Sequence, residues 1–150
     1  MEIFIDADAC PVKDEVYRVA RRHRIKVHVV ANSFIFVPAD PLVARVVVEA
    51  GPDAADDWIA KHARAGDIVI TADIPLAERA LNADCAAITP GGRRFTHDSI
   101  GAAIASRAVA EQIRSTGGLA GGPKPFQRAD RSRFLQALDE TVHAELRRRR

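Results

Sequence analysis

Residues 2–20 read EIFIDADACPVKDEVYRVA. The apolar run at 2–6 predicts a buried β-strand. Pro11 suits the first turn of a helix, and valine and alanine recur after it at the spacing of one helical face. A strand that leads directly into a helix is the building unit of an α/β sheet, and Asp6 and Asp8 lie where the two meet.

The same alternation continues along the chain. Further strands are expected at 25–31, 42–50, 67–71 and 85–88. Helices are expected at 53–65, 75–83, 98–114 and 130–147, with loops at 32–41 and 90–97. Strands rich in valine and isoleucine that alternate with helices favour a parallel sheet covered on both faces. The sequence therefore predicts a three-layer α/β/α sandwich around a central parallel sheet of about five strands.

The domain organisation is expected to be simple. A chain of 150 residues suits one domain, 1–150, with a single core. Residues 115–127 hold four of the nine glycines and two of the eight prolines, so they are predicted to form a flap or a linker rather than a regular element. Residues 128–150 are predicted to form a C-terminal helix that ends in an arginine tail.

The composition is that of a globular protein. Hydrophobic residues make up 47% of the chain and charged residues 28%. No apolar run approaches the roughly 20 residues that a membrane helix needs, and the N-terminus enters a strand without a basic leader. We expect a cytoplasmic protein without a membrane partner, and the sequence does not indicate its oligomeric state.

Cysteine and histidine spacing does not indicate zinc. Cys10 and Cys85 are too few for a disulfide scaffold, and the five histidines show no regular ligand spacing. Cys10 precedes the predicted helix, where a thiol can be activated, but no histidine lies near it in sequence to serve as a base.

The net charge of +2 depends on the C-terminal tail. The last four residues are arginines, so the rest of the chain carries a net charge of −2. Cations at the end of a helix complement its dipole, which explains the tail without a partner. Other basic patches lie at 21–24, 93–94 and 128–133, and these favour contact with a phosphate backbone.

Aspartates follow three of the expected strands. They stand at Asp6 and Asp8, at Asp53, Asp56 and Asp57, and at Asp73. The carboxyl ends of parallel strands share one edge of a sheet, so aspartates from three such positions can meet in space. Clustered carboxylates repel one another, and a hard cation such as Mg²⁺ or Mn²⁺ relieves the repulsion.

Each aspartate also has a structural interpretation. Asp8 lies near the start of the first helix and Asp73 near the start of another, where each carboxylate can cap the helix. The three aspartates at 53–57 share one face of a first helical turn, where negative charge is favourable. An aspartate at the end of a central strand is poorly solvated, so a functional role is favoured most for Asp6.

Five longer motifs resemble one family. They are DADACPVKDE at 6–15, VAN at 30–32, GPDAADDWIA at 51–60, GDIVITADIPLAERAL at 66–81 and TGGLAGGPKPFQRADRSRF at 116–134. The chain resembles the YaiI/YqxD family of small bacterial proteins, which is placed in the PIN-like (NYN) nuclease superfamily. The resemblance implies a PIN-like sandwich with strand order 3-2-1-4-5 and an acidic edge that binds Mg²⁺ or Mn²⁺ and cuts RNA.

The resemblance also implies site residues. By position in the motifs, the implied metal ligands are Asp6, Asp57 and Asp73, with Asp53, Asp56 and Asp8 close behind. We expect the neighbouring carboxylates, Asp8 or Asp56, to orient a water or accept its proton. The candidate substrate-binding residues are Lys13, Asn32, Thr71, Arg107 and Lys124.

The function that these observations favour is metal-dependent hydrolysis of phosphodiester bonds, with RNA as the preferred substrate. Two alternatives stay open, a non-catalytic module that binds metal or RNA and a phosphatase of the haloacid-dehalogenase type. Such a phosphatase also begins with D-x-D after its first strand, but here the pair Asp56–Asp57 precedes Thr71 instead of following it. A receiver domain needs a lysine after its fifth strand, where this chain has Pro90.

Overall fold

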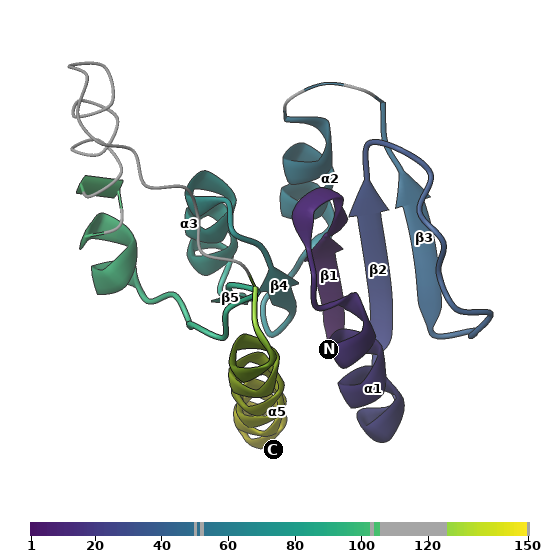
Figure 1. The fold of residues 1–150 in the computed structure, drawn as a ribbon. Coiled ribbons are helices and arrows are strands. Elements are labelled where there is room, and N and C mark those ends of the chain that lie inside the picture. Colours follow the sequence, from purple (N-terminus) through teal and green to yellow (C-terminus); the bar gives the residue numbers. More distant parts are fainter. Residues whose placement is uncertain (50, 52, 103, 106–125, 150) are drawn as a thin grey trace.

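The computed structural model describes residues 1–49, 51, 53–102, 104–105 and 126–149 (Figure 1). Five strands form one fully parallel sheet in the order β3-β2-β1-β4-β5. They are β1 (Glu2–Asp6), β2 (Lys26–Ala31), β3 (Val43–Val47), β4 (Ile68–Ile70) and β5 (Ala86–Ile88). This arrangement confirms the predicted parallel sheet and its strand order.

Helices connect most of the strands. They are α1 (Lys13–His23), α2 (Ala54–His62), α3 (Ile74–Asn82) and α5 (Arg128–Arg148), with a short 3₁₀ turn, η1 (Ala7–Ala9), after β1. Residues 97–102 are also helical. The link from β2 to β3 has no helix, as expected for 32–41, and it runs back along the outer strand of the sheet (Figure 1).

The two faces of the sheet bury different helices. On β1, Ile3 and Ile5 face a core that contains Phe134 of α5 together with the apolar side of α1. Phe4 points the other way, into a core that contains Ile59 of α2 and the apolar side of α3. Because successive side chains of a strand alternate, one apolar run supplies both cores, and the three-layer α/β/α prediction is confirmed.

Several boundaries differ from the predicted ones. Pro11 and Val12 form a turn, and α1 begins at Lys13, because Val12 does not have helical backbone angles. The strand predicted at 42–50 is shortened to β3, which is an edge strand with Val47 half exposed. The helix predicted at 98–114 and the glycine-rich segment at 115–127 fall largely outside the described residues.

The last helix extends slightly beyond the residues 130–147 expected to be helical and lies within the predicted C-terminal segment 128–150. It starts at Arg128 with a capping box between Gln127 and Asp130 and continues to Arg148. Near its end, the Arg148 guanidinium contacts Asp84 at 3.0 Å and Glu145 at 3.1 Å. Part of the arginine tail is therefore folded onto the domain. Within the described residues, no helix combines the length and the apolar character that crossing a membrane would require.

Candidate functional site at the carboxylate edge

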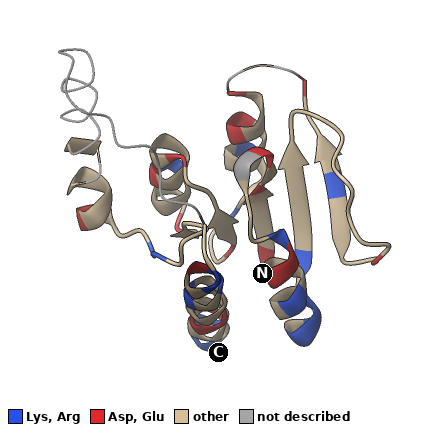
Figure 2. Cartoon of the chain, in the orientation of Figure 1, with Lys and Arg blue, Asp and Glu red and all other residues tan. Residues whose placement is uncertain are grey.

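Three aspartates meet where the central strands end. Asp6 is the last residue of β1, Asp73 is the N-cap of α3 just beyond β4, and Asp56 lies in the first turn of α2. Figure 2 shows acidic residues after β1 and at the start of α2, at the carboxyl end of the sheet. We call Asp6, Asp56 and Asp73 the carboxylate edge.

Thr71 holds two members of the carboxylate edge in place. Its side chain is buried, and its hydroxyl donates to Oδ2 of Asp6 at 2.9 Å and accepts from the backbone N–H of Asp73 at 2.9 Å. Oδ1 of Asp73 accepts from the N–H of Leu76 at 2.9 Å, which is the capping role expected for it. Hydrogen bonds thus hold one oxygen of the Asp6 carboxylate and one of the Asp73 carboxylate, and this sets the direction in which the second oxygen of each points.

The carboxylate edge carries more negative charge than its surroundings balance. Burial, followed by the charges of Asp73 and Asp6, raises the pKa of Asp56 to about 7. Burial also raises the pKa of Asp6, and the charges of Asp73 and Asp8 act in the same direction. Within the described ranges, none of these three carboxylates forms an ion pair with Lys, Arg or His. Such a group favours a proton or a cation.

Asp56 and Asp57 lie on different sides of α2. Asp57 is exposed, and its Oδ1 accepts from the Arg79 guanidinium of α3 at 2.8 Å. Asp56 instead lies close enough to Asp73 and Asp6 for their charges to raise the pKa of its carboxyl. The resemblance implied Asp57 as a ligand and placed Asp56 behind it, whereas the geometry favours Asp56, because adjacent residues of a helix point about 100° apart.

Asp8 and Asp53 flank the carboxylate edge. Asp8 does not cap α1; both of its oxygens accept from the N–H of Asn32, at 3.2 and 3.0 Å, and so tie η1 to the end of β2. The Asn32 side chain donates to the Gly51 carbonyl at 2.8 Å. Asp53 is the exposed N-cap of α2, but its side chain makes no capping hydrogen bond.

Of the candidate basic residues, the structure describes Lys13 alone. Nζ of Lys13 donates to the carbonyls of Cys10 at 2.7 Å and Ala7 at 3.5 Å, so it braces the turn that carries Asp8. Arg107 and Lys124 lie outside the described residues.

Cys10 is buried, and burial raises the pKa of its thiol, which disfavours the thiolate that a catalytic cysteine needs.

The carboxylate edge offers oxygen ligands suited to a hard cation. Among the described residues, the three carboxylates do not form a group whose ligand atoms all lie within 4.8 Å of one another. Mg²⁺ usually takes one or two protein carboxylates directly and keeps several waters, so a cation here would contact one or two of them and reach the third through water.

Two features of the surface depart from the sequence analysis; the first is aromatic, although an aromatic content of 5% did not indicate a surface that stacks bases. Phe34 and Phe36 are 60% and 88% exposed on the segment after β2, and their rings meet edge to face at 5.3 Å. The second is the group of His23, Asp139 and His143, whose members come from α1 and α5. Its only local signal is the i, i+4 spacing of Asp139 and His143.

One family model matches most of the chain. This family model, whose description reads "Uncharacterized BCR, YaiI/YqxD family", matches residues 4–144. The chain belongs to the YaiI/YqxD family. The match includes β1 from Phe4 onward, the carboxylate edge and most of α5, so the observed fold and site are built from residues that lie within the family's extent.

Relatives in the YaiI/YqxD family span almost the same length. The chain is 60% identical over 140 residues to a UPF0178 protein of Caulobacter vibrioides, covering 93% of this chain and 92% of the relative. It is 55% identical over 147 residues to UPF0178 protein bll3966 of Bradyrhizobium diazoefficiens, covering 98% and 88%. UPF0178 protein Rru_A0086 of Rhodospirillum rubrum is 56% identical over 145 residues, covering 96% and 97%. No solved structure matches the chain.

Proposed function

We propose that the protein is a metal-dependent nuclease that hydrolyses phosphodiester bonds, with RNA as its substrate, at the carboxylate edge. The observation that carries the proposal is the convergence of Asp6, Asp56 and Asp73 at the end of the central strands without a basic partner among the described residues. The sheet order β3-β2-β1-β4-β5 supports it, because it is the order implied by the resemblance to PIN-like nucleases.

The residues divide into separate roles. Asp6 and Asp73 each keep one oxygen that Thr71 or the α3 backbone does not occupy, and these oxygens would hold Mg²⁺ or Mn²⁺. When bound, the cation would lower the pKa of a water and balance charge on the phosphoryl oxygens. Asp56, which has no basic partner among the described residues, would orient that water or accept its proton.

The exposed phenylalanines support a single-stranded nucleic acid as substrate. Phe34 lies two residues beyond Asn32, which contacts Asp8 beside the carboxylate edge. The Arg45 guanidinium of β3 lies 4.1 Å from the centre of the Phe34 ring. Exposed aromatic rings beside a cation are typical of surfaces that stack bases and contact phosphates, and such stacking is worth about 1–3 kcal/mol per base.

The test is cleavage of a labelled single-stranded RNA by purified protein in EDTA, Mg²⁺ or Mn²⁺. We expect cleavage only with a metal, and its loss in Asp6→Asn but not in Asp14→Asn, which alters an exposed carboxylate on α1. RNA binding without cleavage in any metal would contradict the nuclease and favour a binding module. Turnover of a phosphomonoester but not of RNA would favour the phosphatase.

A further inference from the structure

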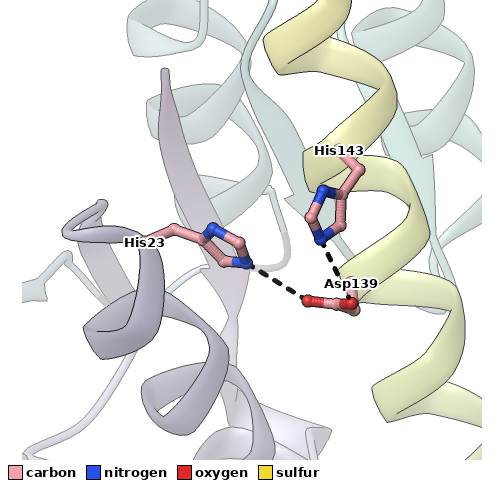
Figure 3. Close-up of side chains that lie close together, drawn as sticks. All are labelled: His23, Asp139 and His143. Atoms are coloured by element: carbon pink, nitrogen blue, oxygen red, sulfur yellow. Dashed lines mark hydrogen bonds and ion pairs between the residues drawn. The ribbon is translucent and has the colours of Figure 1, made fainter.

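A second group of possible metal ligands lies away from the carboxylate edge. His23 is in the last turn of α1, and Asp139 and His143 are one turn apart on α5. Since His23 stands just before β2 begins, the group lies toward the opposite end of the sheet from Asp6. Figure 3 shows both imidazole rings turned toward the carboxylate that lies between them.

The distances within this group suit a small transition-metal ion. Nε2 of His23 lies 3.2 Å from Oδ1 of Asp139, and Nε2 of His143 lies 3.4 Å from Oδ2. One ligand atom from each residue can be chosen so that all three lie within 4.8 Å of one another. Ligands bound at 2.0–2.1 Å in a tetrahedron are separated by about 3.3 Å, so little movement is needed to enclose an ion.

The types of ligand select the metal. Two imidazole nitrogens and one carboxylate oxygen form a set that binds Zn²⁺ well, whereas Mg²⁺ prefers oxygen ligands alone. The side chain of His23 is 14% exposed, that of Asp139 33% and that of His143 52%. The group is thus largely buried at His23 and open to solvent at His143, where a water molecule can occupy the fourth coordination position of the metal.

The Asp139 carboxylate is the centre of the group. The guanidinium of Arg22 lies 3.7 Å from its Oδ1. The two imidazole rings meet edge to face with their centres 5.1 Å apart, so a nitrogen of each ring approaches the same carboxylate. Neutral imidazole is the form of histidine that binds a metal.

We propose that His23, Asp139 and His143 form a Zn²⁺ site that joins α1 to α5, with water as the fourth ligand. The site is separate from the proposed nuclease centre. Both helices pack on the same face of the sheet, and the metal would fix α5 against α1 at that face. A metal that binds only the folded chain stabilises it by mass action.

The test is a calorimetric titration of tag-free, chelator-treated protein with Zn²⁺ in excess Mg²⁺. The wild-type chain should bind one Zn²⁺, and saturation should raise its Tm. His143→Gln should weaken binding by at least about 10–100-fold, as should His23→Gln. His97→Gln is the matched control, since His97 is exposed and lies outside the group, and it should bind as the wild type does.

His143 is exposed enough that its variant should remain folded, which circular dichroism checks. The proposal is overturned if folded wild-type protein does not bind Zn²⁺. It is equally overturned if Zn²⁺ binds the His23→Gln/His143→Gln double variant with unchanged affinity, or if His97→Gln loses as much affinity as His143→Gln.

Discussion

At the scale of single residues, the site depends on the directions in which the neighbouring side chains of Asp56 and Asp57 point. Asp56 and Asp57 are neighbours in α2, yet one approaches Asp73 and the other pairs with Arg79. Thr71 decides the orientation of Asp6, because its hydroxyl is held in turn by the backbone of Asp73. A single buried hydroxyl therefore couples two of the proposed ligands.

Replacing Thr71 tests this coupling. Thr71→Val keeps the volume and removes both hydrogen bonds, so we expect cleavage of RNA to fall by about 10–100-fold as the ligand loses its orientation. Thr71→Ser keeps the hydroxyl and should recover most of the rate. Steady-state kinetics on both variants check the expectation, and a rate in Thr71→Val equal to or higher than that in Thr71→Ser would show that the hydroxyl does not orient the site.

At the scale of elements, the loop after β5 is held against α5. Gly92 has φ of +88°, and a Cβ atom there would lie 2.7 Å from the carbonyl carbon of Arg133 and 2.8 Å from the nitrogen of Phe134. Backbone atoms of a helix cannot move aside as a flexible side chain can. Gly92 thus permits the close approach of the loop to the helix that covers one face of the sheet.

We expect Gly92→Ala to lower the free energy of unfolding by about 2 kcal/mol or more, from the positive φ and the overlap together. Gly101→Ala is the control, because a Cβ at Gly101 meets nothing within 4 Å and alanine suits a helix. Urea unfolding of the three proteins gives the comparison. If Gly92→Ala is as stable as the wild type, the described approach of the loop to α5 is wrong.

Much of the fold could be predicted because strand signals are local. The valine and isoleucine runs located all five strands, and the aspartates at their ends located the carboxylate edge. The choice between Asp56 and Asp57 could not be made, since both occupy the first turn of α2 and the position of Arg79 was unknown. His23 and Asp139 are 116 residues apart, so their 3.2 Å contact depends on tertiary packing alone.

At the scale of the whole molecule, the carboxylate edge makes stability depend on pH. The pKa of Asp56 is raised from 3.8 to about 7 in the folded chain, so the folded state holds a proton that the unfolded state has released. Its stabilising contribution is complete below pH about 3.8 and is lost as pH rises to about 7. Asp6 acts in the same direction.

We therefore expect the metal-free protein to lose about 1–2 kcal/mol of stability between pH 5 and pH 8, since solvent screens a half-buried carboxylate. Asp56→Asn should remove most of this loss and be more stable than the wild type at pH 8. Mg²⁺ should restore stability to the wild type at pH 8 and much less at pH 5. Thermal unfolding with and without Mg²⁺ checks this, and a steeper pH dependence in Asp56→Asn would refute it.

The most direct test of the account compares two neighbouring carboxylates in one reaction. The initial rate of single-stranded RNA cleavage is measured in Mg²⁺ for the wild type, Asp56→Asn and Asp57→Asn, each with an EDTA control. The account predicts a loss of about 100-fold or more in Asp56→Asn, whose carboxylate faces Asp73, and a rate within a few-fold of the wild type in Asp57→Asn, whose carboxylate pairs with Arg79. Full activity in Asp56→Asn, or cleavage that persists in EDTA, would contradict it.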